Sequence, residues 1–212
     1  TKEVLTWDRK KGGLIAQSEV RIGAIILGTR PLTQFSPSAA KEAILEALKE
    51  EGQFLLDWNE DVWQLLNRIE SLRIWNKDAT WPVWTQEKLL ETVENWIEPY
   101  IVQITKNEDF KKLNLVEILK HQLTFEQQQT LDELAPSKLS VPSGSLIPIT
   151  YKPEGANPLL SVRLQELFGL LDTPKVNRGQ VPVLIEMLSP GFKPVQLTQD
   201  LKSFWTNGYF EV

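Results

Sequence analysis

The chain has 212 residues, no cysteine and a formal net charge of −5, from 23 basic and 28 acidic side chains. Its length permits a sizeable core, built as one large domain or two small ones. The chain is mildly acidic, so it does not resemble an autonomous nucleic-acid-binding protein, which carries a strongly basic stripe. The absence of cysteine excludes a disulfide framework, a thiolate zinc site and a cysteine nucleophile.

Residues 1–35 are predicted to form a β-rich segment of short antiparallel strands. Stretches rich in apolar and β-branched residues at Glu3–Trp7, Leu14–Ala16 and Val20–Leu27 indicate the strands, and the run Arg9–Gly13 supplies a glycine-based reversal. The three cations of that run could contact phosphates. Exposed turns normally carry charge, so we favour a solvated hairpin tip.

Residues 36–135 are predicted to be mostly helical, as a bundle between two β-rich segments. Ser36 before Pro37 is typical of a helix start, and the apolar stripe of this first helix continues to Gly52. Asn59 can cap a second helix, which places carboxylates in its first turn. The apolar face of that helix comprises Val62, Leu65, Leu66, Ile69 and Leu72.

Three more helices are predicted in this region. Thr85 opens one that ends near Pro99 and Tyr100. Asn114 and Thr124 each begin a helix with the spacing of a capping box, because an acidic or amide side chain follows three residues later.

Tryptophan is concentrated in the helical region, which contains six of the eight tryptophans of the chain. These are Trp58, Trp63, Trp75, Trp81, Trp84 and Trp96. Exposed tryptophans could form a stacking platform for unpaired bases. Because the side chain is large and apolar, and several lie on or beside apolar stripes, we favour packing in the joints between helices.

Residues 136–212 are predicted to form a compact α+β module. Leu146–Tyr151, Val181–Leu188 and Pro194–Thr198 indicate short strands bounded by proline and glycine turns. Val162–Gly169 has apolar residues at helical spacing and ends on glycine, so it is predicted to be a helix.

Two further details of the module follow from single residues. Pro148 cannot donate to a ladder, so it indicates an edge position or a bulge in its strand. Thr198 or Asp200 can cap a last helix that runs through Trp205. The fold class is therefore α+β: N-terminal short antiparallel strands, a central mostly α-helical bundle and a C-terminal compact α+β module with short strands.

The residues of this module also carry a resemblance to a known family. The words LSVPSGSLIPITY, RLQELFGL, DTPKV, VPVLIEMLSPG and KPVQLTQDLKSFW occur in this order between Leu139 and Trp205. They resemble the C-terminal region of the HrpB family of bacterial ATP-dependent helicases, relatives of the DEAH-box RNA helicases. The upstream words TWPVW, LLETVENWIEPY and LDELAPSKLSVPSGS are similar to the same family, so the resemblance is loose over most of the chain and tight from about Leu131 onward.

The resemblance implies a C-terminal accessory region that assists nucleic-acid binding or regulates a motor. Two RecA-like motor domains, which hold ATP and magnesium, would precede it in the same protein and would be its partners, together with RNA or another single-stranded nucleic acid. The glycine-rich phosphate loop and the acidic magnesium box of such a motor do not occur in this sequence. We therefore expect no cofactor, metal or catalytic residue in this region, and no ATPase activity from it alone.

The expected location is the cytoplasm, without a membrane partner. No apolar run is long enough to span a bilayer, no signal peptide is recognisable, and a chain without cysteine fits a reducing compartment. The chain begins with Thr1 and its one methionine is Met187, so we expect it to be a piece of a longer protein.

Candidate contacts with nucleic acid are the cations, amides and aromatic groups of the resembling block. They are Arg163, Gln165, Lys175, Arg178, Lys193, Gln196, Lys202 and Trp205, with Phe192 as a further stacking group. Packing and turn geometry explain most of the block's words, and direct RNA contact is the alternative. Arg163 and Gln165 could equally make buried hydrogen bonds that tie the predicted helix to the strands.

Two other classes of function remain open. The acidic helical half and its tryptophans could dock a partner protein, which makes the chain a protein-protein interaction module without nucleic-acid contact. A stand-alone enzyme would need a cleft lined by perturbed carboxylates. The one histidine, His121, is predicted to be an ordinary residue at a helix surface or boundary.

Overall fold

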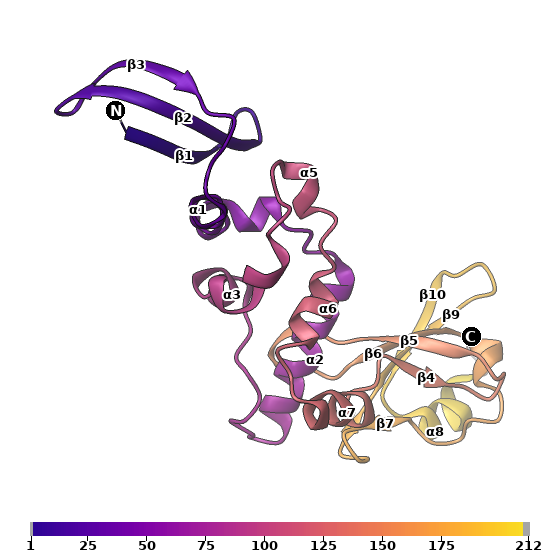
Figure 1. Cartoon of the computed structure of the whole chain (residues 1–212). Helices are drawn as coiled ribbons and strands as arrows, with labels where there is room; N and C mark the ends of the chain where they lie inside the picture. Colours follow the sequence, from indigo (N-terminus) through magenta and orange to yellow (C-terminus); the bar gives the residue numbers. More distant parts are fainter. Residues whose placement is uncertain (1, 210–212) are drawn as a thin grey trace. The chain divides into compact units, whose positions relative to one another are not determined.

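The computed structural model describes residues 2–209, which gather into two compact units (Figure 1). Unit 1 comprises the described residues up to Asn59 together with Thr85–Gln122, and unit 2 comprises Glu60–Trp84 and the described residues from Leu123 onward. The α+β class is confirmed. The helical region predicted over residues 36–135 is shared between the two units, and its division into three segments stays a prediction.

A three-stranded antiparallel sheet opens unit 1, in the order β1-β2-β3. Its strands are β1 (Lys2–Asp8), β2 (Gly13–Ile22) and β3 (Ile25–Pro31). The predicted third strand, Val20–Leu27, was wrong in its position. The chain reverses at Gly23, whose φ of +57° suits a residue without a Cβ, so that stretch is divided between β2 and β3.

Three helices of unit 1, α1, α3 and α6, begin at the predicted caps. In α1 (Pro37–Leu55), the Ser36 hydroxyl accepts a hydrogen bond from the Ala39 amide at 3.1 Å. The helix runs past Gly52, the predicted end, because this glycine is buried where α1 meets Leu90. The other helices are α3 (Gln86–Glu91), α4 (Glu94–Ile97), the 3₁₀ helix η1 (Glu98–Tyr100), α5 (Asn107–Phe110) and α6 (Leu115–Lys120).

The long helix predicted from Thr85 to Tyr100 is interrupted. Thr85 caps α3 and the helical region ends at Tyr100, as expected, but the α-helical path breaks at Thr92, which has φ −114° and ψ 26°. The hydroxyl of Thr92 donates to the Lys88 carbonyl at 2.9 Å. This bond gives the backbone an alternative to the helical ladder, so one predicted helix becomes α3, α4 and η1.

In unit 2, two helices and the short elements beside them accompany a five-stranded sheet with the order β10-β9-β6-β5-β4. Neighbouring strands are antiparallel except β6 and β9, which are parallel. The strands are β4 (Lys138–Ser140), β5 (Leu146–Thr150), β6 (Leu159–Arg163), β9 (Leu184–Leu188) and β10 (Pro194–Thr198), and a two-stranded sheet pairs β7 (Lys175–Val176) with β8 (Val181–Pro182). The helical elements are α2 (Glu60–Trp75), α7 (Phe125–Leu134), η2 (Pro153–Gly155), η3 (Leu164–Leu167), α8 (Leu201–Ser203) and the π-helical turn η4 (Phe204–Gly208).

The helix predicted over Val162–Gly169 is wrong in its first part. Val162 lies in β6, opposite Met187 of the parallel strand β9, and only Leu164–Leu167 forms a 3₁₀ turn. The apolar side chains of β6 alternate, with Leu160 fully buried and Val162 2% exposed. Burial against a distant strand has therefore overridden the local helical spacing, while Gly169, at φ +95°, does end the turn.

The strand predicted over Val181–Leu188 divides at Val183. The Val183 amide donates to the Pro174 carbonyl at 2.9 Å, whereas the next amide, of Leu184, donates to the Pro158 carbonyl at 2.8 Å. Consecutive amides thus bond to different segments, and the chain passes from the small sheet (β8) into the large one (β9).

Pro148 lies in β5, which is an interior strand without a register shift, so neither predicted alternative, an edge position or a bulge, is found. The neighbouring Ile149 amide donates to the Ser137 carbonyl at 2.9 Å, on the β4 side. Adjacent residues of a strand point their amides to opposite sides, so the donor missing at Pro148 would face β6. The ladder to β6 starts only at Ile149, so no ladder bond is lost.

The core of unit 2 forms where α2 meets the large sheet. All five residues of the predicted apolar face of α2 are buried. Tyr151, 1% exposed, donates its hydroxyl to the Pro136 carbonyl at 2.7 Å. From α2, Gln64 accepts the Tyr151 amide at 2.7 Å and Asn67 donates to the Tyr151 carbonyl at 2.9 Å. These bonds fix the end of β5 on α2.

Of the six tryptophans, Trp81 and Trp96 are buried, as the favoured interpretation requires, whereas Trp58, Trp75 and Trp84 are half-buried and Trp63 is 37% exposed. Trp81 and Trp96 are 5% and 4% exposed, and the indole of Trp96 donates to the Leu89 carbonyl at 2.8 Å. Trp75 donates to the Gly155 carbonyl at 2.6 Å. Across residues 2–209, none of the helices combines the length and apolar character that crossing a membrane requires.

Candidate nucleic-acid interface

The hairpin between β9 and β10 projects beyond the rest of its sheet (Figure 1). Its turn is closed by three hydrogen bonds around Ser189: the Phe192 amide donates to the Ser189 carbonyl at 2.9 Å, the Ser189 amide to the Lys193 carbonyl at 2.8 Å, and the Lys193 amide to the Ser189 hydroxyl at 3.2 Å. Pro190 and Gly191, between Ser189 and Phe192 in this turn, follow the end of β9, as the sequence predicts. Both Phe192 and Lys193 are exposed at this turn.

Arg163 reaches this turn from the end of β6. It pairs with Leu188 across the parallel ladder, and Leu188 also pairs with the first residue of β10. The Arg163 guanidinium lies 5.2 Å from the ring centroid of Phe192, and its Nε donates to a Glu166 carboxylate oxygen at 3.3 Å. Hydrogen bonds from Ser145 and Arg163 lower the pKa of Glu166, so this carboxylate stays ionised and holds the guanidinium.

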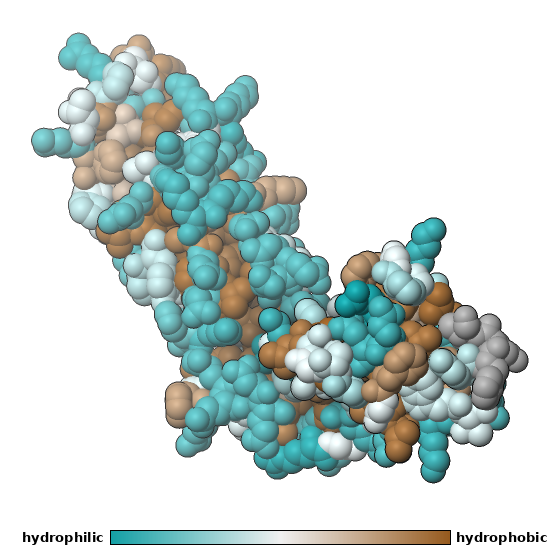
Figure 2. All heavy atoms as spheres, turned by 90° about the vertical axis from the view of Figure 1, so that its right-hand side faces the viewer, coloured by the Kyte–Doolittle hydropathy of each residue, from teal (hydrophilic) through white to brown (hydrophobic). Residues whose placement is uncertain are grey.

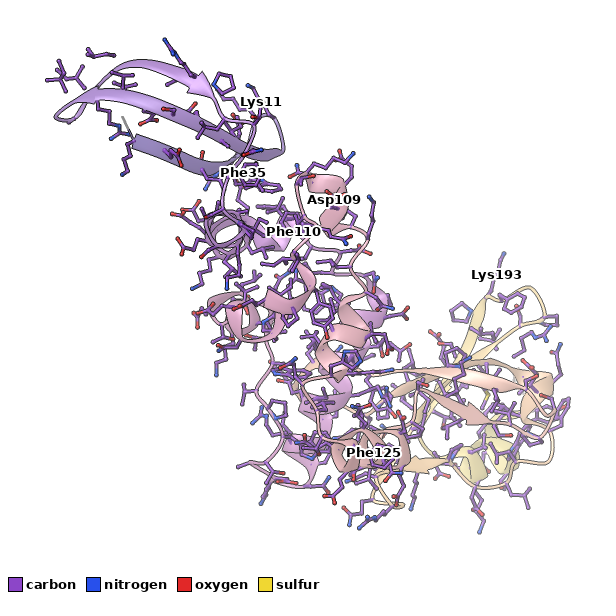
Figure 3. The ribbon with its side chains drawn as sticks, in the orientation of Figure 1. Lys11, Phe35, Asp109, Phe110, Phe125 and Lys193 are labelled. Carbon is purple, nitrogen blue, oxygen red and sulfur yellow. The ribbon has the colours of Figure 1, made fainter. Side chains whose placement is uncertain are left out.

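Lys193 follows Phe192, and its side chain points away from the sheet (Figure 3). Gln196 is exposed further along β10 and lines a hollow of about 290 Å³ whose other walls include Ser203 and Asn207. Lys202, exposed on α8, is adjacent in sequence to that wall. Arg163 thus lies beside the turn that carries Lys193. Gln196 pairs with Met187, which also pairs with Val162, so the side chains of Gln196 and Arg163 lie on opposite faces of the large sheet.

Trp205 belongs to an aromatic cluster. Its indole donates to the Leu170 carbonyl at 2.7 Å, and its ring centroid lies 5.9 Å from that of Phe168, 5.1 Å from Phe204 and 5.5 Å from Tyr209. The ring is half-buried, and Phe168 is 51% exposed beside it. Part of the stacking surface of Trp205 is thus already used within the protein.

The remaining candidates lie elsewhere in unit 2. Lys175 and Arg178 lie on the β7–β8 hairpin of the small sheet, and the Arg178 guanidinium is 3.6 Å from a Glu133 carboxylate oxygen. Gln165 is exposed in η3, so it is not a buried link between helix and strands. Sequence reasoning did not identify Glu166, the anchor of Arg163; its signal was the i, i+3 spacing of opposite charges.

The basic run near the N-terminus forms the tip of the β1–β2 hairpin. Arg9 pairs with Glu51 at 2.9 Å and also with Glu50, while Lys10 and Lys11 are exposed. This arrangement is the charged hairpin tip favoured from the sequence, with Arg9 occupied by carboxylates.

Unit 1 also exposes an apolar edge that the sequence analysis did not identify. β3 is an edge strand of its sheet, and large apolar residues on and around it are 45–68% exposed. They are Val20, Ile22, Ile25, Ile26 and Leu27. In Figure 2, brown apolar spheres lie among teal polar ones over this sheet. An exposed edge strand of this kind can accept a further strand.

His121 is exposed, and its Nδ1 lies 2.8 Å from the Tyr100 hydroxyl, which agrees with the surface position predicted for it. Within residues 2–209, no three His, Asp or Glu side chains lie close enough together to hold a metal ion.

Comparison with known proteins identifies the family. The family model described as "ATP-dependent helicase C-terminal" matches residues 96–212, and that for "ATP-dependent RNA helicase HrpB, connector region" matches residues 1–32. The chain is 33% identical over 210 residues to the ATP-dependent RNA helicase HrpB of Escherichia coli (strain K12), covering 99% of this chain and 26% of the relative.

Two solved structures agree with this match. They are the E. coli DExH-box NTPase HrpB, with a TM-score of 0.82, and the Escherichia coli DEAH/RHA helicase HrpB, with a TM-score of 0.78. Each is 32% identical to this chain and is matched over 99% of this chain and 26% of its own length. The chain thus spans about a quarter of the relatives it matches. It belongs to the HrpB family of ATP-dependent helicases and corresponds to their C-terminal region.

Proposed function

We propose that this region is an accessory element of an ATP-dependent RNA helicase and contacts single-stranded nucleic acid along the β10 edge of the large sheet. The observation that carries the proposal is the fixed position of the Arg163 guanidinium over Phe192, with the exposed Lys193 beside it. These groups lie at one end of a module with 7 basic and 6 acidic residues, whereas residues 1–136 hold 16 and 22. A local, positively charged contact fits this distribution better than a wide basic surface.

Each group has a chemical role in this proposal. Lys193 and Lys202 contact phosphates as point charges, whereas Arg163 offers a planar fork whose orientation Glu166 fixes. Gln196, on the wall of the hollow, donates and accepts hydrogen bonds with base or sugar edges. These groups are too few to recognise the bases of several successive nucleotides, so we expect the contact to bind a single strand without strong sequence preference.

The energy for strand movement would come from motor domains outside these residues. The sequence has no glycine-rich phosphate-binding loop, so in this proposal ATP and magnesium would be held by that motor. Nucleic acid bound to this region would regulate the motor only if its affinity differs between two motor states.

Titration of this chain with a single-stranded RNA oligomer at two salt concentrations tests the proposal. Phosphate contacts release counterions, so the affinity should fall steeply as salt rises. The matched variants are Arg163→Gln, which should weaken binding, and Lys138→Gln, an exposed cation on the opposite edge strand β4, which should not. Absence of binding at low salt would overturn the proposal.

A second candidate function, docking of a partner protein, is favoured by the exposed apolar edge around β3. An added strand would bond to the free side of β3 and cover Ile25 and Leu27, which are 66% and 60% exposed. Such an interface is mostly apolar, so its affinity would change little with salt. A salt-insensitive partner that Ile25→Lys releases, together with no RNA binding, would establish this function in place of the first.

A further inference from the structure

Phe192 has a backbone conformation that its residue type disfavours. Its φ is +62°, in the left-handed region where the Cβ of an L residue crowds the neighbouring carbonyl oxygen. Glycine is the usual residue at this place in a hairpin turn. The turn bonds around Ser189 are made by backbone groups of Phe192 and Lys193, so a side chain at Phe192 adds nothing to closing the hairpin.

The Phe192 side chain also adds little to the core. It is 66% exposed at the tip of a hairpin that extends beyond its sheet. The Arg163 guanidinium lies over one face of the ring, 5.2 Å from the ring centroid. Because Glu166 fixes that guanidinium, the ring has a preferred orientation while most of its surface stays open to solvent.

We propose that Phe192 is a stacking platform for one unpaired base of a single-stranded RNA, with Lys193 contacting the adjacent phosphate. This inference rests on the nucleic-acid contact proposed above and names the group that receives the base. A base presents a flat apolar face to the ring and carries a phosphate on either side, which matches an aromatic residue followed by an exposed lysine.

The charges beside the ring favour a nucleic acid over a protein pocket. A partner protein that enclosed Phe192 in an apolar pocket would remove water from Arg163 and Lys193, which is costly unless it also supplied carboxylates for both. A nucleotide supplies anionic oxygens beside the stacked base and leaves the other side of the cations in water.

The backbone strain gives the proposal a distinctive signature. Replacing Phe192 by glycine removes the crowding at positive φ and the platform together, so binding should weaken while stability is kept or raised. If Phe192 only supported the fold, its replacement by glycine would lower both the stability of the chain and its affinity for RNA.

The test uses the 212-residue chain and a single-stranded RNA oligomer with 2-aminopurine at one position, whose fluorescence is quenched when the base stacks. The unaltered chain should bind and quench. Phe192→Leu should bind about tenfold more weakly, the loss of one stacked base, and should not quench. Phe192→Tyr should keep both properties. Phe192→Gly should bind as weakly as the leucine variant with an unfolding midpoint that is unchanged or raised.

The matched control is Phe125→Leu, on α7 and away from the hairpin, where the ring is 73% exposed (Figure 3). It should leave binding and quenching unchanged. If the unaltered chain binds RNA and Phe192→Leu binds and quenches equally, the platform is overturned while the nucleic-acid contact stands. If the unaltered chain shows no RNA binding at low salt, both are overturned.

Discussion

Arg68 of α2 and Asp132 of α7 form an ion pair of which only the arginine is buried. Their atoms are 2.7 Å apart, and the side chains are 8% and 76% exposed. The guanidinium also donates to the Ala135 carbonyl at 2.6 Å and, less closely, to the Leu131 carbonyl. The Leu131 carbonyl also accepts the Ala135 amide at 3.0 Å, whereas the Ala135 carbonyl follows the last turn of α7, where the helix has no further amide of its own to bond it. Arg68 therefore caps one helix from another.

Arg68→Met should lower the free energy of unfolding by about 1–3 kcal/mol, because the buried Ala135 carbonyl loses its donor. Asp132→Asn should cost less than about 1 kcal/mol, since an exposed carboxylate gains little from the pair. Urea unfolding followed by circular dichroism measures both. Equal effects of the two variants would show that the ion pair, and not the helix cap, stabilises this joint.

Two glycines of the N-terminal sheet should respond oppositely to alanine. A Cβ at Gly13 would lie 2.9 Å from the backbone carbonyl oxygen of Thr105, which cannot move aside like a flexible side chain. The same carbonyl accepts the Leu14 amide at 3.0 Å. Gly13→Ala should therefore cost about 1–3 kcal/mol in urea unfolding. At Gly28 nothing lies within 4 Å, so Gly28→Ala should be neutral or slightly stabilising. A neutral Gly13→Ala would contradict the close approach.

The sequence predicted the helix starts because a cap is a local feature. Ser36, Thr85, Asn114, Thr124 and Asp200 each precede a helix, and each side chain accepts an amide of the first turn. A side-chain oxygen at the N-cap can accept a hydrogen bond from the backbone amide three residues later, and this bond does not depend on the rest of the fold.

The errors arose where distant segments decide the structure. Val162 became part of a strand because β9 lies beside it, and no local spacing records that pairing. At the candidate site, too, local features were predictable and contacts between distant segments were not. The residue types were predictable, but the approach of Arg163 to Phe192 depends on β6 pairing with β9 and on the left-handed turn. The exposed edge at β3 was missed because no local pattern in the sequence records whether another segment covers an apolar strand.

The capping carboxylate of Asp109 should make the fold sensitive to acid. It accepts a hydrogen bond from the Lys112 ammonium at 2.9 Å and hydrogen bonds from the backbone amides of Thr105 and Lys106 at 3.1 and 3.2 Å. These bonds, that from Lys112 first, hold the pKa of Asp109 well below its usual range. The unfolded chain binds this proton more readily, so the stabilisation is complete above about pH 4 and is lost as the pH falls.

Asp109→Asn should therefore be less stable than the unaltered chain at pH 7, and the difference should shrink between about pH 4 and pH 2. Urea unfolding at a series of pH values measures this. Glu108→Gln, a neighbouring exposed carboxylate, is the control and should keep the acid dependence of the unaltered chain. A constant difference across the pH range would show that Asp109 acts only through its shape.

The salt dependence of RNA binding should identify which cations touch phosphates. For a single strand, the slope of log affinity against log salt is about 0.7 per phosphate contact, so Lys193→Gln should reduce its magnitude by about that amount. Lys138→Gln, with the same loss of charge on the β4 edge, should leave the slope unchanged, because a general field effect is screened over about 10 Å at 0.1 M salt. If both lysines reduced the slope equally, the cations would act through net charge, and the strand would have no fixed path beside β10.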